Sequence, residues 1–199
     1  MPRPAPDGRL LVDGIVNDIT DRHLVEEQLA AAHERLSHMA FHDHLTGLPN
    51  RAQFEQHLQV ALGRAGRDGT AVAVFFVDLD GFKPINDVHG HGVGDALLRA
   101  VADRLGAATR DGDVVARLGG DEFLMLAPIG SPDDTVTTDA VCARVSELLA
   151  DAFVVDGHRL VVGGSIGLAV YPRDAETPDE LIRQADLAMY RTKHNRRAA

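Results

Sequence analysis

Apolar runs separated by short polar breaks predict alternating strands and helices along most of the chain. Residues 71–77 are uniformly apolar, which indicates a buried strand over residues 70–78. Two further apolar runs, at 114–116 and 124–127, flank a glycine pair and predict a tight β-hairpin. Residues 159–171 are expected to form one or two more strands.

Helices are expected where apolar residues recur every three or four positions. Asn50 suits the N-cap of a helix that starts at Arg51 and ends near Arg64. Gly66 and Gly69 follow and are expected to break it. Further helices are predicted at residues 84–89, 92–108, 140–153 and 178–193, with a polar stretch at 129–139. The inward faces of the two longest are predicted to be Leu97, Leu98, Val101 and Leu105, and Leu181, Ile182, Ala185, Ala188 and Met189.

The predicted elements follow the order strand, helices, strand, strand, helix, strand and a closing helix. This order matches the ferredoxin-like palm, an α+β fold. We therefore expect a central, mainly antiparallel sheet surrounded by helices over residues 41–199. A chain of 199 residues is long enough for one such domain with a full core and an appendage.

The start of the chain does not belong to this pattern. Residues 1–7 are rich in proline and small side chains and are expected to be disordered. Residues 9–20 form a β-like run that ends in Asn-Asp-Ile-Thr, which resembles the last strand of a PAS sensor domain. A lone strand cannot bury a core, so residues 1–20 contain no working sensor, and a plain linker is an equally good interpretation.

A helical pattern covers residues 21–40. Leu29 and Leu36 share one heptad position, and the other is occupied by Val25, Ala32 and Met39. We favour a parallel coiled-coil dimer, because a helix this short is marginally stable unless it packs against something. The alternative is an amphipathic helix that packs on its own domain.

Composition limits the classes of partner. Lys and Arg total 20 against 30 Asp and Glu, and the net charge of −10 argues against a surface for nucleic-acid polymers. Cys142 is the single cysteine, so no internal disulfide forms and a reducing cytosol is expected. The apolar run at residues 71–77 is too short to cross a bilayer, so no membrane contact is expected within this chain. Any membrane tether would lie outside it.

Two acidic clusters carry the candidate chemistry. Asp121 and Glu122 directly follow the glycine pair at the tip of the predicted hairpin. A second cluster, Asp78-Leu79-Asp80, ends the buried strand. Two strand ends that deliver carboxylates to one divalent cation have the geometry that nucleotidyl transfer requires. The alternative is a set of solvated turn residues.

Several sequence blocks around these clusters resemble the GGDEF diguanylate cyclases over residues 40–197. That family condenses two GTP molecules into cyclic di-GMP and releases pyrophosphate, on a nucleotide-cyclase palm. The blocks occur in the family's order: DHLTGLPNR at 43–51, DLDGFKPIND at 78–87, HGHGVGD at 89–95, RLGGDEF at 117–123, SIGLA at 165–169 and ADLAMY at 185–190. The ordered set is far more specific than any one block.

The resemblance assigns roles at the metal. Asp78, the carbonyl of Leu79 and Asp121 are expected to bind Mg²⁺ or Mn²⁺, since hard cations prefer oxygen ligands. Glu122 is either a ligand to a second metal or the base for the ribose 3′-hydroxyl. Asp80 is expected to orient a ligand or to pair with Lys83. Ser165 is expected to be a strand residue rather than a nucleophile.

The resemblance also assigns the GTP contacts. Backbone N–H groups of the turn at Phe82 and the ammonium of Lys83 are expected to hold phosphates, and Lys83 thereby assists catalysis. Asn86 and Asp95 match the positions that read guanine. At the far end, Lys193 and Arg197 match positions that grip the terminal phosphate, although Arg196 stands where the family usually has glycine.

The resemblance also implies a site for inhibition by product and a homodimer. Arg110 and Asp113 match the family's Arg-x-x-Asp site, which binds cyclic di-GMP as an inhibitor, and the alternative is a surface turn. Each domain would hold one GTP, so two domains must face each other in a homodimer in the bacterial cytoplasm. The rival functions are a cyclic di-GMP effector without catalysis and a GTP-binding regulator of a phosphodiesterase.

Overall fold

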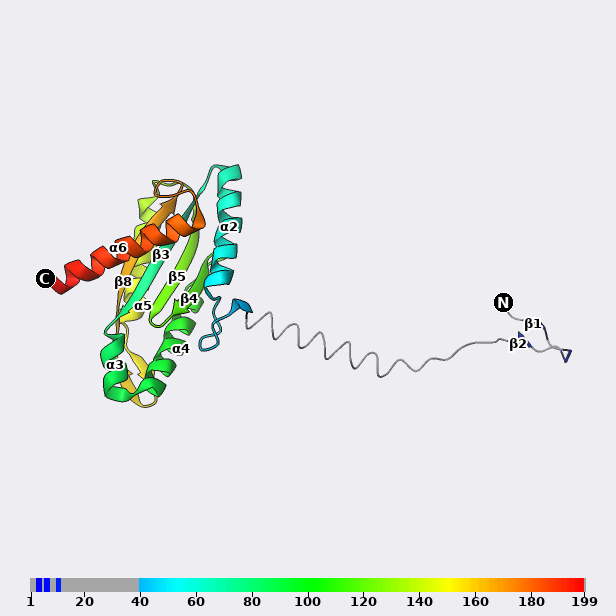
Figure 1. Ribbon diagram of the computed structural model, residues 1–199, viewed down its shortest axis with the longest axis horizontal. Helices are drawn as coiled ribbons and strands as arrows, with labels where there is room; N and C mark the ends of the chain where they lie inside the picture. The colour runs from blue at the N-terminus through cyan, green and yellow to red at the C-terminus, as the bar shows by residue number, and fades with distance from the viewer. Residues whose placement is uncertain (1–2, 5, 8–9, 12–39, 199) are drawn as a thin grey trace. The chain divides into compact units, whose positions relative to one another are not determined.

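The computed structural model describes residues 3–4, 6–7, 10–11 and 40–198 (Figure 1). The chain divides into two units, Met1–His38 and Met39–Ala199. In the first unit, strand β1 (Arg3–Pro4) pairs with β2 (Leu10–Leu11). The PAS-like ending and the heptad positions lie outside the described residues.

A four-stranded antiparallel sheet forms the centre of the second unit. Its strands are β3 (Ala71–Asp80), β4 (Val114–Gly119), β5 (Glu122–Ile129) and β8 (Gly163–Tyr171). They lie in the order β4-β5-β3-β8, and every neighbouring pair is antiparallel. This is the strand order of a split βαβ fold, so the predicted α+β palm is confirmed.

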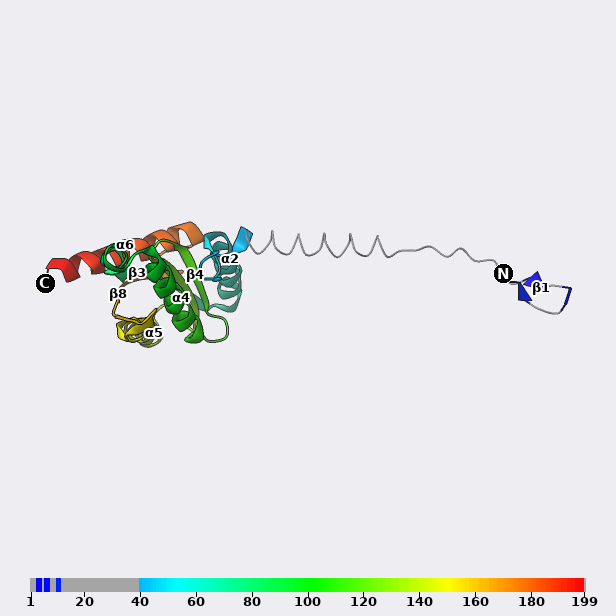
Figure 2. The same cartoon turned by 90° about the horizontal axis from the view of Figure 1, so that it is seen from below.

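Helices cover both faces of the sheet (Figure 2). Helices α2 (Arg51–Asp68) and α6 (Pro178–Ala198) pack on one face, and α4 (His91–Ala107) and α5 (Thr135–Ala150) pack on the other. The short helix α3 (Phe82–His89) begins just beyond the end of β3. The sheet therefore lies between two hydrophobic layers.

Strand β3 is buried on both faces because helices cover it on each side. Phe75 and Val77 join the core under α4 and α5, whereas Val74 and Phe76 join the core under α2 and α6. Adjacent residues of a strand point to opposite faces. A central strand covered on both faces reads as a continuous apolar run, which is the pattern that predicted it.

Several predicted boundaries are wrong by a few residues. Helix α2 continues through Gly66 and ends at Asp68, where Gly69 takes the left-handed conformation with φ of 67°. Helix α3 starts at Phe82 rather than at residue 84. Helix α6 extends past Lys193 to Ala198.

The region around α5 departs further from the prediction. Helix α5 starts at Thr135, because the Asp134 side chain caps it by accepting from the Thr137 N–H. Ile129 is a buried residue of β5 rather than part of a polar stretch. Phe153 leaves the helix and starts β6 (Phe153–Val155), which pairs with β7 (His158–Leu160) in a hairpin that the sequence pattern did not reveal.

No helix among the described residues is long and apolar enough to span a membrane. The inward faces predicted for α4 and α6 are buried, except that Ala188 is only half-buried. The longest helices are thus amphipathic elements of a packed domain.

Cys142 on α5 provides a test of this packing. Burial, followed by the charge of Asp139, raises the pKa of the Cys142 thiol to about 11. At pH 8 the thiolate should be roughly a hundredfold scarcer than for a free cysteine, whose pKa is about 8.5. We expect slow labelling by iodoacetamide in the native protein and fast labelling in urea. Equal rates in both conditions would contradict the packing of α5.

Candidate functional site

The ends of β3 and β5 bring the two acidic clusters together. Asp78 and Glu122 are directly opposite each other in the antiparallel pair. One residue further, the Leu79 N–H donates to the Asp121 carbonyl at 3.1 Å. Residues more than forty positions apart in the sequence thus lie at one corner of the sheet.

The hairpin that carries Asp121 depends on its two glycines. Gly119 has φ of 143° and Gly120 has φ of 53°, both in the region that favours glycine. The β4–β5 register also shifts between Arg117 and Gly119. The chain therefore turns tightly enough to place Asp121 at the tip and Glu122 as the first residue of β5.

Arg117 clamps this hairpin from inside, a role that the sequence analysis missed. Its side chain is buried, and its Nε and Nη2 donate to the Gly120 carbonyl at 3.1 and 2.8 Å. Its Nη1 donates to Asp43 Oδ1 at 2.8 Å. The Asp43 carboxylate also accepts from the N–H and hydroxyl of Thr46, at 3.0 and 2.6 Å. The loop before α2 is thereby tied to the hairpin.

The pKa of Asp43 reflects this clamp. Burial alone would raise the pKa of Asp43, but hydrogen bonds from Thr46 and Arg117 outweigh burial and hold it below its ordinary value of 3.8. The charged form of Asp43 is therefore the stabilised one. Its partner Arg117 stands two positions before the glycine pair of the motif, and this position is the signal that would have identified it.

Asp78 is paired with a cation from a distant helix. Its side chain is buried, and its Oδ1 accepts from the Lys193 Nζ of α6 at 2.5 Å. Asp78 and Lys193 were both predicted as site residues, and the structure brings them into contact. A single lysine does not balance the three carboxylates Asp78, Asp121 and Glu122.

The negative charge that Lys193 does not neutralise contributes to raised pKa values at two of these carboxylates, Asp121 and Glu122. Burial, followed by repulsion from Asp78, raises the pKa of Asp121. Burial, followed by repulsion from Asp78, Asp121 and Asp186, raises the pKa of Glu122. Such mutual repulsion favours the binding of an added cation.

The oxygen donors at this corner fit a hard divalent cation. Among the described residues, no three His, Cys, Asp or Glu side chains form a complete metal site. Mg²⁺ does not need one, because it is commonly bound by one or two carboxylates, with phosphate oxygens and water as the other ligands. Asp78 and Asp121 supply two such carboxylates.

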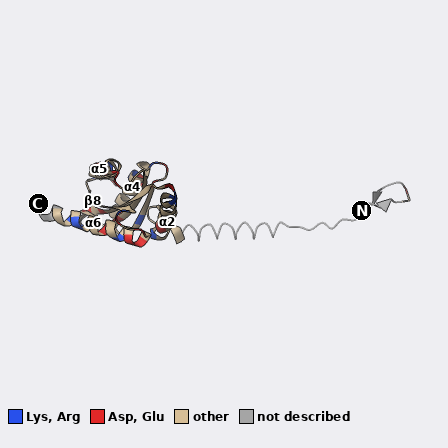
Figure 3. Ribbon diagram, turned by 90° about the horizontal axis from the view of Figure 1, so that it is seen from above, with Lys and Arg blue, Asp and Glu red and all other residues tan. Residues whose placement is uncertain are grey.

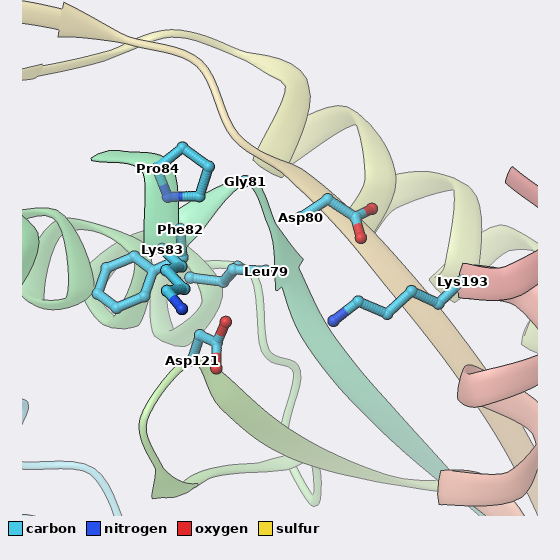
Figure 4. Close-up of a pocket in the computed structure, with 8 residues that line it drawn as sticks. All are labelled: Leu79, Asp80, Gly81, Phe82, Lys83, Pro84, Asp121 and Lys193. Atoms are coloured by element: carbon cyan, nitrogen blue, oxygen red, sulfur yellow. The ribbon is translucent and has the colours of Figure 1, made fainter. Parts of the chain in front are cut away.

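A cavity of about 410 Å³ opens beside these carboxylates (Figure 4). Lys83 and Lys193 extend into it from opposite sides of Asp121. Asp80, which was expected to orient a ligand or pair with Lys83, accepts hydrogen bonds from the Ser165 hydroxyl at 2.9 and 3.1 Å. Ser165 itself is fully buried in β8. The remaining lining residues are Leu79, Gly81, Phe82 and Pro84.

Asn86 and Asp95 lie on α3 and α4, next to the turn between those helices. The Oδ1 of Asn86 is buried and has no hydrogen-bond partner. A Cβ at Gly94 would lie 1.8 Å from that oxygen, so only glycine leaves room for it. Asp95, the next residue, is exposed. The Asn86 amide is thus held in place with an unused acceptor.

Arg110 lines a separate cavity, and Asp113 is hydrogen-bonded to Arg110. Asp113 Oδ2 accepts from the Arg110 N–H at 2.9 Å and lies 3.9 Å from Nη2 of Arg144 on α5. The Nε and Nη2 of Arg144 are buried without a hydrogen-bond partner. Arg110 and Arg144 line a cavity of about 150 Å³ that shares no residue with the first. The sequence analysis missed Arg144, and no local signal marks it.

Arg197 lies within α6, and the structure describes its backbone alone. Its predicted phosphate contact therefore stays a prediction.

Comparison with known proteins identifies the family. The family model described as "Diguanylate cyclase, GGDEF domain" matches residues 40–199. The chain belongs to the GGDEF diguanylate cyclase family. A diguanylate cyclase of Pseudomonas aeruginosa, TpbB, is 43% identical over 166 residues, which are 82% of this chain and 38% of that protein. MucR of the same species, a bifunctional diguanylate cyclase and cyclic di-GMP phosphodiesterase, is 42% identical over 83% of this chain and 24% of its own length.

Solved structures agree with this assignment. A sensory box/GGDEF family protein from Caulobacter crescentus is 42% identical, with a TM-score of 0.74 over 77% of this chain and 98% of that one. The coiled coil and GGDEF domain of DgcB from the same species, in complex with cyclic di-GMP, is 26% identical, with a TM-score of 0.76 over 89% and 93%. This chain spans less than two fifths of the length of TpbB and MucR.

The clamp in this GGDEF domain gives a stability prediction. Arg117→Ala should lower the free energy of unfolding by about 3 kcal/mol, because it leaves the partly buried Asp43 carboxylate without its cation. Urea denaturation measures the change. Glu55→Gln, which removes the exposed Arg51–Glu55 pair, serves as the control and should cost less than about 1 kcal/mol.

The Arg117–Asp43 pair also predicts how the stability of the domain depends on pH. A lowered pKa in the folded state means that Asp43 contributes stability above its ordinary value of 3.8, and that this contribution is lost as the pH falls through the lower folded pKa. The difference between wild type and Arg117→Ala should therefore shrink in acid. If the difference in the free energy of unfolding stays constant from neutral pH to pH values well below the pKa of free Asp, the role of the Arg117–Asp43 pair is contradicted.

Proposed function

We propose that this chain is a metal-dependent diguanylate cyclase that condenses two GTP into cyclic di-GMP and releases two pyrophosphates. The observation that carries the proposal is the corner where Asp78, Asp121 and Glu122 lie together, with Asp121, Lys83 and Lys193 lining one cavity beside it. Anionic ligands of a metal lie beside cations suited to phosphate, as the binding of a metal nucleotide requires.

Asp78, Asp121 and the Leu79 carbonyl would hold Mg²⁺ or Mn²⁺. Cyclases of this family generally depend on a metal. When bound, the ion would neutralise phosphate charge and polarise the α-phosphate. The raised pKa values of Asp121 and Glu122 support this assignment, because a cation would relieve the repulsion that contributes to them. Glu122 would serve either as a second-metal ligand or as the base for the 3′-hydroxyl.

The chain's own residues would position one GTP. Lys83, Lys193, Arg197 and the backbone N–H of Phe82 would hold the phosphates beside Asp121, and positioning of this kind supplies much of the rate enhancement. Asn86 would accept a hydrogen bond from guanine, and its unpartnered Oδ1 supports that role. Asp95 would accept from the N1–H and amino edge of the same base.

Each chain would supply one of the two GTP molecules. The 3′-oxygen of one GTP attacks the α-phosphorus of the other, the bond to the β-phosphate oxygen breaks, and pyrophosphate leaves. Two domains of a homodimer must therefore face each other. Residues 21–40 would form the coiled coil that holds them, after the remnant of a sensor in residues 1–20. Because GTP is a cytosolic nucleotide, we place the domain in the bacterial cytoplasm.

Product would inhibit the enzyme at the cavity of Arg110 and Arg144. Arg110 and Asp113 would bind cyclic di-GMP, and Arg144 would join them. The Nε and Nη2 of Arg144 are buried without a hydrogen bond, although Nη2 forms a long ion pair of 3.9 Å with Asp113. These unused donors support the addition, since a guanidinium with free N–H groups favours an anionic ligand. The coiled coil and GGDEF domain of DgcB, which was solved in complex with cyclic di-GMP, supports a product complex for this chain.

The first test of the function is turnover. Purified chain incubated with GTP and Mg²⁺ should form cyclic di-GMP, and Asp121→Asn should lower kcat by at least about a hundredfold because a metal ligand is lost. Chromatography of the nucleotides measures both. Asp111→Asn, an exposed carboxylate outside the site, is the control. Binding of GTP or cyclic di-GMP without turnover by wild type would instead favour a regulator or an effector.

The second test concerns feedback. Arg144→Ala and Arg110→Ala should each raise the cyclic di-GMP concentration for half-inhibition by about tenfold or more, with unchanged initial rates, because each loses a charge-assisted hydrogen bond. Inhibition curves with added product measure this. Arg159→Ala removes an exposed arginine elsewhere and should leave the curve in place. Unchanged inhibition in Arg144→Ala would remove that residue from the site.

A further inference from the structure

A second cavity of about 500 Å³ lies beside Glu122, and it shares no lining residue with the cavity beside Asp121. Arg51 from the start of α2 and Arg183 from α6 line it together with Glu122. The hairpin therefore presents its two consecutive carboxylates to two different cavities. The function proposed above uses the first cavity for the chain's own GTP and gives no role to the second.

The fold explains this placement. Glu122 lies opposite Asp78, and each is two positions from a residue that faces α2 and α6, Leu124 for Glu122 and Phe76 for Asp78. Residues two apart on a strand share a face, so these carboxylates lie on the face that α6 covers. Arg183 and Lys193 are ten residues apart on α6, which corresponds to about 15 Å along a helix. Helix α6 thus carries one cation to each cavity.

The charges make the second cavity a poor site for a free nucleotide. Its two arginines are accompanied by three carboxylates, Glu122, Asp179 and Asp186. Acidic and basic segments follow one another along α6 (Figure 3). A triphosphate in solution would gain little from this mixture. A phosphate that is held in place by a second chain is different, because its effective concentration at the cavity is high.

Arg183 is available for such a contact. Its side chain is exposed, and among the described residues it has no hydrogen-bond or ion-pair partner. Arg51 is also exposed and pairs with Glu55 at 2.8 Å, so it is partly satisfied within its own helix. Guanidinium groups stay charged at all working pH values and match phosphate oxygens with two donors. Arg183 is therefore the stronger candidate.

We propose that Arg183, assisted by Arg51, acts in trans on the α-phosphate of the GTP held by a second copy of this chain. This inference rests on the proposed function, since a second chain must bring its own GTP. In each bond-forming step, the 3′-hydroxyl of one GTP gives up its proton to a base and its oxygen bonds to the α-phosphorus of the other. The bond from that phosphorus to the β-phosphate oxygen breaks, and pyrophosphate leaves. The arginine of the copy that supplies the 3′-hydroxyl stabilises the negative charge that develops on that phosphate.

The direct test separates binding from turnover. Arg183→Ala should bind GTP with wild-type affinity in a monomeric sample, because the chain's own GTP lies in the other cavity. At saturating GTP and protein its kcat should fall about a hundredfold, the usual cost of losing one such donor. Arg183→Lys should recover part of the rate. Arg191→Ala removes the same charge from α6 at a different cavity and should behave as wild type.

A mixed sample tests the action in trans. In a dimer of Arg183→Ala and Asp121→Asn, action in trans places the intact arginine of one chain on the GTP beside the intact metal ligands of the other, so one phosphodiester bond should form at a near-normal rate. The linear dinucleotide pppGpG should therefore accumulate in this mixture and in neither variant alone. Action in cis leaves no phosphate with both groups, so a mixture that makes no more pppGpG than the single variants would overturn the action in trans. Light scattering at the same concentration should give equal dimer fractions for both variants and wild type.

Three results would overturn the inference: an unchanged kcat in Arg183→Ala, a loss of GTP affinity that accounts for the lost rate, or a loss of the dimer. A wild-type chain that forms no cyclic di-GMP at any concentration would contradict the proposed function itself. That outcome appears before any variant is made, so the two failures are distinguishable.

Discussion

The site depends on holding carboxylates together where they repel one another. Asp78 and Glu122 are neighbours across two strands, and Asp121 precedes Glu122 at the hairpin tip. Burial and repulsion raise the pKa of Asp121 and of Glu122, so this arrangement is unfavourable without a cation. The register of the sheet maintains it, because a slip of one residue would turn every core side chain of β3 to the wrong face.

The cations around this corner come from separate elements, and two of them tie parts of the domain together. Arg117 joins the hairpin to the loop before α2 through Asp43. Lys193 joins α6 to β3 through Asp78. Lys83 lies on α3 beyond the end of β3. Buried pairs of this kind are expensive to break, so they hold a charged site in one geometry.

Three cavities divide the work proposed for this domain. The one beside Asp121 would hold the chain's own GTP, the one beside Glu122 would meet the partner's GTP, and the one between Arg110 and Arg144 would hold product. They share no lining residue, so substrate binding, action across the dimer and feedback are open to separate mutation. Helix α6 and the β4–β5 hairpin contribute residues to both of the GTP cavities. The 3′-hydroxyl of one GTP and the α-phosphate of the other would therefore meet beside these two elements.

Local patterns in the sequence determined much of this protein. The continuous apolar run predicted β3, the paired glycines predicted the hairpin, and helical spacing predicted the buried faces of α4 and α6. The ordered motifs identified the family. These features depend on residues close in sequence, whose spacing reports strand, turn or helix directly.

Only the tertiary structure decided the long-range pairs. It joined Arg117 to Asp43 across 74 positions, set Arg144 beside Asp113, and gave Asp121 and Glu122 separate cavities. Strands β7 and β8 are the two strands expected over residues 159–171, whereas β6 and its pairing with β7 escaped prediction, because a strand of three residues carries too short a pattern. Which distant side chains meet depends on how helices and strands pack, and periodicity along the chain contains no record of that packing.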